Sequence, residues 1–261
     1  MHISICVNEI LDFLQIQPGQ QGLDATLGYG GHTRRMLEKL QGKGHMYALD
    51  VDPIEIVKTK QRLAEAGYGE DILTIKQTNF RNIDQVAEEA EGFDFILADL
   101  GVSSMQIDNP DRGFTYKFDG PLDLRLDPEK GESAAERLRE VSYEELVGMF
   151  QENSDEPYAE EIATVIMKRN RTKNYVETTT QMKDAIEEAL AFVPEKDRKE
   201  AVKKSCQRCF QALRIDVNSE FEVLYDFLDK LPDALSPGGR VAILTFHSGE
   251  DRLVKKIWKR Q

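Results

Sequence analysis

Three glycines lie in a predicted turn between a short apolar run and a helical pattern near the start of the chain. The apolar run ends at Ala25, the turn contains Gly28, Gly30 and Gly31, and helical spacing follows His32. Glycine adopts positive φ angles and leaves the backbone bare enough for a ligand to approach. The first turn of the helix presents free N–H groups to such a ligand. The pattern predicts a ligand-binding strand–turn–helix unit, with an ordinary tight turn of an α/β domain as the alternative.

The residues around the turn narrow the class of ligand. No Gly-Lys-Ser/Thr sequence follows the glycines, which excludes a P-loop, and the third glycine of the dinucleotide fingerprint is missing. A second apolar run ends in Asp50, about twenty residues further on, where an acid accepts hydrogen bonds from ribose hydroxyls. These residues predict an adenosine-containing cofactor and leave both S-adenosylmethionine and NAD open.

Strand and helix patterns alternate up to residue 99. The predicted strands cover 21–26, 44–50, 71–76 and 93–99, and the predicted helices cover 5–16, 32–41, 53–66 and 82–91. This alternation predicts an α/β fold with a parallel, doubly wound sheet and a ligand at the carboxyl ends of the strands. Phe80 follows the third strand, where its ring packs either on an adenine or into the core.

The fourth predicted strand ends in Asp99, which begins the segment Asp99–Ser104. A carboxylate at this position lies in the predicted crevice beside the glycine turn. It is suited to accept an N–H from a substrate amine or from a cofactor group. The alternative is a strand-ending Asp that caps the next turn.

The alternation stops after residue 104. Residues 105–130 are polar and rich in turn residues, and an ordered loop of this length near a site is usually functional. Helical patterns follow over 132–151, 157–170, 178–192 and 195–208, and the α/β pattern returns with a helix over about 217–231, a turn at 236–239 and a strand over 240–246. We therefore expect a Rossmann-like domain of residues 1–104 and 209–261, interrupted by a helical domain of residues 105–208.

The last predicted strand is followed by His247, Ser248 and, three residues after the serine, Asp251. Ser248 and Asp251 have the form of a capping box at the start of a helix. In the predicted topology His247 faces the crevice, with a purely structural histidine as the alternative.

Composition limits the partners of the chain. Its 261 residues carry a net charge of −13, which argues against indiscriminate binding of nucleic acid. The charge is uneven, however, because residues 168–214 contain 12 Lys and Arg against 7 Asp and Glu. This basic segment fits either a surface for one polyanion or a solvated helical face.

Other features of the sequence bear on the compartment. No apolar stretch is long enough to cross a membrane, and the first residues lack the basic region of a signal peptide. Three cysteines, an odd and low count, suit a reducing cytoplasm. Cys206 and Cys209 form a single C-x-x-C, which we expect to be two thiols on a helix and not a metal or redox site.

Several motifs match one family and occur in the same order over nearly the whole chain. They are Asp24–His32, Leu49–Pro53, Asp99–Ser104, Arg112–Arg125, Phe210–Ile215 and Phe246–Arg252. The Arg112–Arg125 block is far more specific than any glycine loop. On these residues the sequence resembles the RsmH/MraW methyltransferases, which methylate the N4 amine of a cytidine in small-subunit (16S) ribosomal RNA with S-adenosylmethionine.

The resemblance implies a Rossmann-like class I methyltransferase with an inserted, mostly helical domain, and it makes NAD a distant second choice. It places the cofactor contacts on Gly30, Gly31, His32, Asp50, Phe80, Asp99 and Gln106. We expect Asp99 to be the catalytic hydrogen-bond acceptor for the amine, although the same carboxylate also fits a cofactor contact. For the RNA we expect contacts from Lys203, Lys204, Arg208 and Arg214 in the basic segment. We expect no metal, a cytoplasmic location, and a monomer or homodimer.

The sequence departs from the family pattern at several positions. The segment Lys204–Cys209 stands where the family usually has His-Pro-Ala-Thr-Arg-Thr and keeps only Arg208. Met105 replaces a usual Pro, and Gly249 replaces a usual Leu. The family also continues past the position of Gln261 through a basic tail. These differences indicate a divergent paralogue or a truncated chain, so an alternative target (another RNA base or a protein amine) and a non-catalytic role in ribosome assembly stay open.

Overall fold

The computed structural model describes residues 4–259 and divides into two compact units. The first, which we call the sheet unit, comprises Met1–Ser103 and Phe221–Gln261. The second, which we call the helical unit, comprises Ser104–Glu220. The helical unit is therefore inserted into the sequence of the sheet unit.

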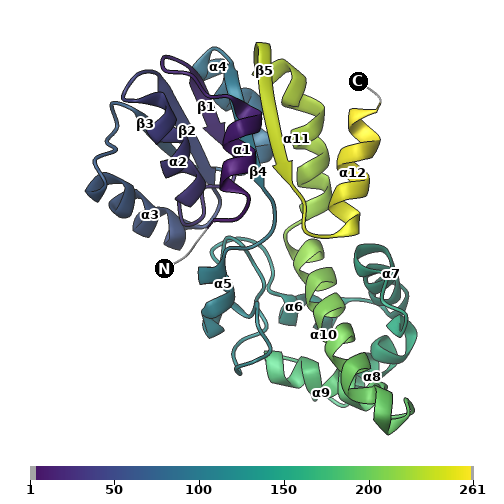
Figure 1. Ribbon diagram of the computed structural model, residues 1–261. Helices are drawn as coiled ribbons and strands as arrows, with labels where there is room; N and C mark the ends of the chain where they lie inside the picture. The colour runs from purple at the N-terminus through teal and green to yellow at the C-terminus, as the bar shows by residue number, and fades with distance from the viewer. Residues whose placement is uncertain (1–3, 260–261) are drawn as a thin grey trace. The chain divides into compact units, whose positions relative to one another are not determined.

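Five parallel strands form the sheet in the order β3-β2-β1-β4-β5 (Figure 1). Their bounds are β1 Gln21–Asp24, β2 His45–Asp50, β3 Leu73–Gln77, β4 Phe93–Asp99 and β5 Leu235–Leu244. The chain reverses its direction of travel across the sheet between β1 and β4, and ligands of such sheets bind at the carboxyl ends of the strands beside this switch point. The predicted doubly wound parallel sheet is confirmed.

Helices cover both faces of this sheet. Helices α1 (Val7–Leu14), α2 (Gly31–Leu40) and α3 (Pro53–Glu65) supply apolar residues to one core cluster. Helices α4 (Ile83–Ala90), α11 (Glu220–Ala234) and α12 (Ser248–Trp258) supply them to the cluster on the other face. A single turn of 3-10 helix, η1 (Phe80–Asn82), precedes α4. The amphipathic spacing of the predicted helices thus follows from packing against a sheet.

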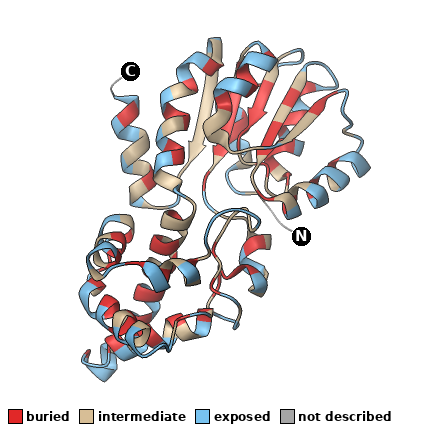
Figure 2. Cartoon of the chain, turned by 180° about the vertical axis from the view of Figure 1, so that it is seen from behind, coloured by how far each residue is buried: buried red, intermediate tan, exposed pale blue. Residues whose placement is uncertain are grey.

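The strands differ in burial along the sheet. Strand β4, which lies between β1 and β5, is almost entirely buried, whereas every residue of the edge strand β5 from Arg240 to Leu244 is intermediate (Figure 2). The predicted turn at 236–239 appears as an irregularity in β5. Leu235 pairs with Phe93 and Arg240 with Phe95, so the residues between Leu235 and Arg240 bulge from the ladder.

The helical unit contains α5 (Ser104–Asp108), η2 (Pro110–Arg112), α6 (Ala134–Glu140), α7 (Tyr143–Ser154), α8 (Ala159–Arg171), α9 (Thr179–Ala189) and α10 (Glu195–Val217). The helix predicted over 132–151 is in fact two helices. The backbone of Val141 is extended, and Ser142 forms a capping box with Glu145 that starts a new helix. The helix start predicted at Thr178 is confirmed by a capping box with Gln181.

The second limit of the inserted unit lies at 220/221 in the structure and not at the expected 208/209. The reason is that α10 does not end near residue 208 but continues to Val217. Cys209, Phe210 and Leu213, which lie beyond the expected limit, are buried in the core of the helical unit. Residues 209–220 therefore fold with the helices.

The long loop after η2 is braced from within the helical unit. The buried Arg112 donates from one Nη to the carbonyl oxygens of Arg125 and Leu126, at 3.1 and 3.0 Å. Asn218, at the end of α10, donates to the Leu124 carbonyl and accepts from the Leu126 N–H, both at 2.8 Å. Leu124 itself has a φ of 65°, a conformation that non-glycine residues rarely adopt. Residues of the Arg112–Arg125 block thus help to hold this loop in one conformation.

Two further expectations from the sequence have outcomes in the fold. Cys206 and Cys209 are free thiols buried on α10, as expected, and burial raises the pKa of Cys206 to about 12. A thiol with so high a pKa is unreactive at neutral pH. Among residues 4–259, no helix is long and apolar enough to cross a membrane.

Candidate active site

The glycines of the β1–α2 turn serve different purposes. Gly28 and Gly30 have φ angles of 48° and 81°. A Cβ on Gly30 would lie 2.7 Å from Cγ2 of Thr59, so packing within the protein requires glycine there. A Cβ on Gly31 would lie 2.1 Å from Oγ of Ser4, so that side chain would have to move. A Cβ on Gly28 would meet nothing closer than 3.9 Å. Gly28 is therefore the glycine of this turn whose surroundings are open for a ligand.

Helix α3 holds the turn in this conformation. Thr59 donates its hydroxyl to the Gly28 carbonyl at 2.6 Å, and Arg62 donates to the Tyr29 carbonyl at 2.8 Å. The Arg62 guanidinium also lies 3.7 Å from the centroid of the Tyr29 ring. Neither Thr59 nor Arg62 is predicted from the sequence. Glu55, Thr59 and Leu63 recur every four residues along α3, and all three are buried. An ordinary amphipathic helix has apolar residues at such positions, so the polar Glu55 and Thr59 were the signal available in the sequence.

Asp50 joins the end of β2 to the glycine turn. One carboxylate oxygen accepts the Gly28 N–H at 2.8 Å and the other accepts the Asp52 N–H at 2.9 Å. Burial raises the pKa of Asp50 to about 6, against the lowering effect of these two hydrogen bonds. Each oxygen retains a second lone pair. The predicted ribose contact is therefore compatible with the role of Asp50 in holding the turn, which the sequence did not reveal.

A second acid that the sequence analysis did not single out lies beneath the turn. Asp24 ends β1, is 1% exposed, and accepts the Thr33 hydroxyl at 2.6 Å and the Thr26 N–H at 3.1 Å. Burial raises its pKa, and the hydrogen bonds and the His32 charge oppose that rise. Because Thr33 lies in the first turn of α2, Asp24 fixes the start of this helix relative to β1.

Asp99 ends β4 and lies beside His32 of α2. Its Oδ2 is 3.5 Å from His32 Nδ1, and its backbone N–H donates to the Thr26 hydroxyl at 2.7 Å. Its Oδ1 is buried and has no hydrogen-bond partner among residues 4–259. Burial raises the pKa of Asp99 to about 6; the His32 charge lowers it, and Asp24 and Glu250 raise it further. A buried acceptor without a partner is costly, which makes Oδ1 a candidate for a contact that the described residues do not supply.

The other two predicted cofactor contacts come from other elements, η1 and α5. Phe80 is half-buried in η1, where its ring packs edge-on against Phe227 with centroids 5.1 Å apart. It therefore belongs to the sheet core while retaining an exposed part. Gln106 is buried in α5 of the helical unit.

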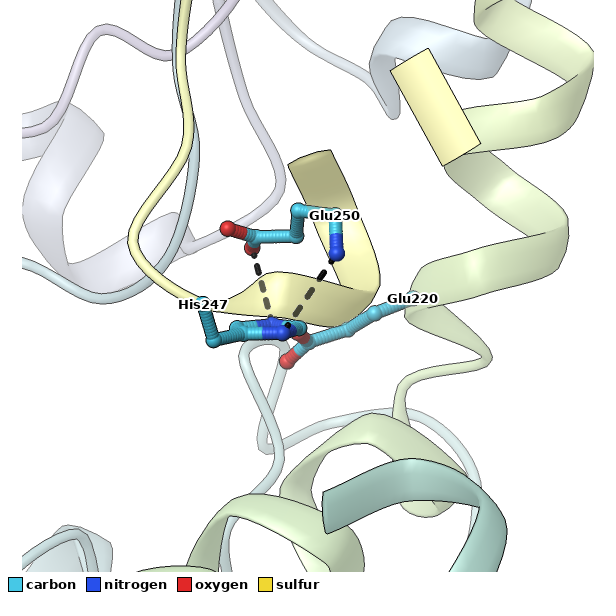
Figure 3. A group of neighbouring side chains, drawn as sticks. All are labelled: Glu220, His247 and Glu250. Carbon is cyan, nitrogen blue, oxygen red and sulfur yellow. Dashed lines mark hydrogen bonds and ion pairs between the residues drawn. The ribbon is translucent and has the colours of Figure 1, made fainter. Parts of the chain in front are cut away.

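His247, and not Ser248, caps helix α12. The Glu250 N–H donates to His247 Nδ1 at 3.4 Å (Figure 3). The Phe246 N–H donates to Glu250 Oε2 at 2.8 Å. The predicted capping box of Ser248 and Asp251 is thus wrong by one residue, because the ring nitrogen takes the place of the usual hydroxyl oxygen. His247 Nε2 lies 3.3 Å from Glu250 Oε1, and both side chains are largely buried.

The departure from the family pattern at Gly249 has a steric reason. A Cβ on Gly249 would lie 2.6 Å from Cζ of Phe221 and 3.1 Å from His247 Nδ1. The ring of Phe221 occupies the space that the usual Leu side chain would need. The first turn of α12 therefore requires glycine here as long as Phe221 keeps its position.

The basic residues predicted to contact RNA lie on α10 and differ in their surroundings. Lys203 and Lys204 are exposed, and Lys204 lies 3.5 Å from Glu200 of the preceding turn. Arg208 is half-buried. Arg214 binds Glu220 through two hydrogen bonds of 2.7 and 2.9 Å, and both side chains are about five-sixths buried. Arg214 thus already has a carboxylate partner, which the sequence analysis did not predict.

The residues of the sheet unit fit an adenosine-containing methyl donor. Gly28 offers an open backbone, and no side chain caps the start of α2 at Gly30. Asp50 retains acceptor capacity for hydroxyls at the end of the neighbouring strand. Asp99, at the end of the strand on the other side of β1, has one carboxylate oxygen without a hydrogen-bond partner within residues 4–259. All of these groups lie at the carboxyl edge of the sheet.

Comparison with known proteins agrees with this arrangement. The model of the MraW methylase family matches residues 1–261. The chain is 70% identical over 259 residues to "Ribosomal RNA small subunit methyltransferase H 1" of Lachnoclostridium phytofermentans, covering 99% of this chain and 71% of that protein. It is also 70% identical to the protein of the same name from Agathobacter rectalis, with 99% and 74% covered.

A more distant relative extends the similarity. "Ribosomal RNA small subunit methyltransferase H" of Carboxydothermus hydrogenoformans is 38% identical over 262 residues, which cover 100% of this chain and 81% of that protein. The fold, the strand-end acids and the match over the whole chain lead to one conclusion. This chain belongs to the MraW methylase family of S-adenosylmethionine-dependent class I methyltransferases.

Proposed function

We propose that this protein transfers the methyl group of S-adenosylmethionine to the exocyclic N4 amine of a cytidine in small-subunit (16S) ribosomal RNA. The observation that carries the proposal is Asp99, whose buried Oδ1 lacks a partner among the described residues at the carboxyl edge of the sheet. An exocyclic amine has the N–H donors that this oxygen requires. The names of the relatives support ribosomal RNA as the molecule that bears the amine.

The residues of the sheet unit would hold the cofactor and orient the amine. Gly28, Gly30 and Gly31 shape the turn, Asp50 accepts ribose hydroxyls, and Phe80 offers the exposed part of its ring to the adenine. Bound S-adenosylmethionine supplies a methyl group on a positively charged sulfur. His32, at the start of α2, lies 3.5 Å from Asp99 Oδ2 and would help to orient this carboxylate when a proton lies between the two groups. Gln106, which the family resemblance assigns to the cofactor, stays a prediction.

Asp99 has the central chemical role in this proposal. The lone pair of a cytosine amine is delocalised into the ring, so the amine is a poor nucleophile. An ionised Asp99 accepts a hydrogen bond from the amine, holds the nitrogen in line with the methyl group and stabilises the positive charge that develops on nitrogen. As the C–S bond breaks and the N–C bond forms, the excess proton on nitrogen passes to the carboxylate or to water.

The helical unit supplies the surface for RNA in this proposal. Its basic segment carries the exposed Lys203 and Lys204 on α10 in a chain of net charge −13. Phosphate contacts from such residues position a nucleic acid without reading its sequence. Arg208 lies on the same helix and is a further candidate for a phosphate contact. Arg214 is paired with Glu220, which favours a structural role. We propose that the protein acts in the cytoplasm, as a monomer or homodimer.

The proposal is tested by incubating the protein with labelled S-adenosylmethionine and unmethylated small ribosomal subunits, followed by mass spectrometry of the nucleosides. N4-methylcytidine is the expected product. A different methylated nucleoside, or label in a ribosomal protein, would establish the alternative target. Binding of S-adenosylmethionine without incorporation into any component would establish the non-catalytic assembly factor. Large subunits serve as the matched control substrate.

A further inference from the structure

An exposed aromatic ring lies beside the segment that follows Asp99. In the pairing of β5 with β4, Leu244 stands opposite Asp99. Phe246 and Gly101 each follow this pair by two residues. A Cβ on Gly101 would lie 3.8 Å from Cδ2 of Phe246, so the ring lies on the side of Gly101 where a side chain would project. Phe246 therefore lies at the carboxyl edge of the sheet, on the side of Asp99 away from the glycine turn.

The ring is exposed although its backbone is firmly held. Phe246 is 57% exposed. Its N–H donates to Glu250 Oε2 at 2.8 Å, and Glu250 is only 4% exposed and donates its own N–H to His247. The capping arrangement in Figure 3 thus anchors the residue that carries the ring. An aromatic side chain has only two rotatable torsions, so on a held backbone it offers a planar surface at little cost in conformational entropy.

Exposure alone does not mark a binding residue, because single exposed apolar side chains are common. Phe13 on α1, for example, is 55% exposed. Phe246 differs from Phe13 in its position, since it neighbours the strand end that carries the unpartnered Asp99 oxygen. A base whose amine reaches Asp99 must also be held in its plane, and enzymes that modify a base hold it by stacking on aromatic or apolar side chains.

We infer that Phe246 is the stacking residue for the base whose amine is methylated. This inference rests on the proposed function and adds to it a residue that contacts the face of the base. Stacking on the ring sets the plane of the base, and the hydrogen bond to Asp99 sets its rotation within that plane. The two contacts together fix the direction of the amine.

The test measures methyl transfer to small ribosomal subunits under single-turnover conditions for Phe246→Ala, Phe246→Leu, Phe246→Tyr and the matched control Phe13→Ala. Base–aromatic stacking contributes enough that its loss corresponds to about 5- to 150-fold. We expect Phe246→Ala to lose activity by a factor in this range, with most of the loss in the transfer rate at saturating RNA. We expect Phe246→Tyr to retain activity and Phe246→Leu to resemble the alanine variant. S-adenosylmethionine affinity, measured by calorimetry, should be unchanged in all four.

Two results of the activity assay would overturn the inference while leaving the proposed function intact. One is wild-type activity in Phe246→Ala. The other is full activity in Phe246→Leu with loss in Phe246→Ala, which would show that apolar volume and not an aromatic face is required. Failure of the wild-type protein to methylate cytidine in the subunits would overturn the proposed function and this inference with it. A loss of S-adenosylmethionine affinity in Phe246→Ala would assign the ring to the cofactor and would also overturn the inference.

Discussion

His32 Nδ1 and Asp99 Oδ2 face each other at 3.5 Å, while the other ring nitrogen of His32, Nε2, lies 2.8 Å from the carbonyl oxygen of Ile5. A carbonyl only accepts, so Nε2 carries a hydrogen. In a neutral His32 this leaves a lone pair on Nδ1, which repels an ionised Asp99. The two groups attract each other only when one proton lies between them. The charge state of the candidate acceptor is therefore coupled to that of its neighbour.

Removing the negative charge of Asp99 should abolish most of the activity. Asp99→Asn keeps the shape of the side chain but loses the charge that favours a partly cationic amine. We expect the transfer rate to fall by about a hundredfold or more, as for the loss of one preorganised electrostatic partner. Single-turnover methylation of small subunits gives the rate, and calorimetry gives S-adenosylmethionine affinity. A large loss of affinity with an unchanged rate would instead assign Asp99 to the cofactor.

The rate should also depend on pH through Asp99. Burial raises its pKa to about 6, so the carboxylate is protonated below this pH and ionised above it. Because only the ionised form accepts both the hydrogen bond and a proton, the rate at saturating cofactor should rise through about pH 6 and level off. The His32 charge lowers the pKa of Asp99, so His32→Ala should move the midpoint to higher pH. An unchanged midpoint in His32→Ala would mean that the pH dependence of the rate does not come from the Asp99–His32 pair.

Asp50 is expected to act on both the cofactor and the fold. Asp50→Ala leaves ribose hydroxyls unpaired and should weaken S-adenosylmethionine binding by roughly 1–3 kcal/mol. It also frees the N–H groups of Gly28 and Asp52, so the free energy of unfolding should fall. Calorimetry and urea denaturation measure the two effects, and Asp71→Ala, at an exposed position, is the control. Lower stability with unchanged affinity would mean that Asp50 only holds the turn.

The hydrogen bond by which Thr59 holds the glycine turn, which we call the clamp, can be tested without substituting a residue of the ligand site. Thr59→Val keeps the volume of this fully buried side chain but removes its hydrogen bond to the Gly28 carbonyl. We expect the free energy of unfolding to fall by about 1–3 kcal/mol, together with weaker binding of S-adenosylmethionine. Thr164→Val, which removes an exposed hydroxyl that bonds within α8, should change stability by less than about 0.5 kcal/mol. Equal effects of the two substitutions would contradict the clamp.

The exposed lysines of α10 should contribute to RNA binding through phosphate contacts. The double substitution Lys203→Glu and Lys204→Glu should weaken binding and reduce the log–log salt slope by about 0.7–0.9 for each phosphate that is no longer neutralised. S-adenosylmethionine affinity should stay unchanged. Lys39→Glu with Lys43→Glu makes the same change of charge at exposed positions of the sheet unit and should have little effect. If both double variants bind subunits as the wild type does, the lysines only solvate their helix.

The alternating half of the fold was predictable because its signals are local. The strands ending in Asp50 and Asp99 are apolar runs that an acid and a turn terminate, and the structure places both ends within a residue of the expected position. The second limit of the inserted unit was not predictable in this way. Cys209, Phe210 and Leu213 continue a helical pattern, but the pattern does not state which of two cores its apolar face enters.

The site was predictable only in part for a related reason. The glycines and strand-end acids form motifs in one stretch of sequence each. Thr59, which holds Gly28, lies far from it in the chain. At the start of α12 a ring nitrogen of His247 caps the helix in place of the usual hydroxyl oxygen. Contacts between residues that lie tens of positions apart follow no fixed spacing, so they cannot be recognised in the sequence.

Among residues 4–259, the buried apolar residues form three clusters, of which one lies within residues 122–213 of the helical unit and the other two lie in the sheet unit. The two clusters of the sheet unit share one sheet, so we expect each unit to unfold as a whole and the melting of this chain to show two calorimetric transitions. A ligand that binds one unit raises the transition of that unit by an amount that grows with its affinity and concentration. S-adenosylmethionine should therefore shift the melting of the sheet unit, and the protein's thermogram becomes a direct report of which half has been occupied.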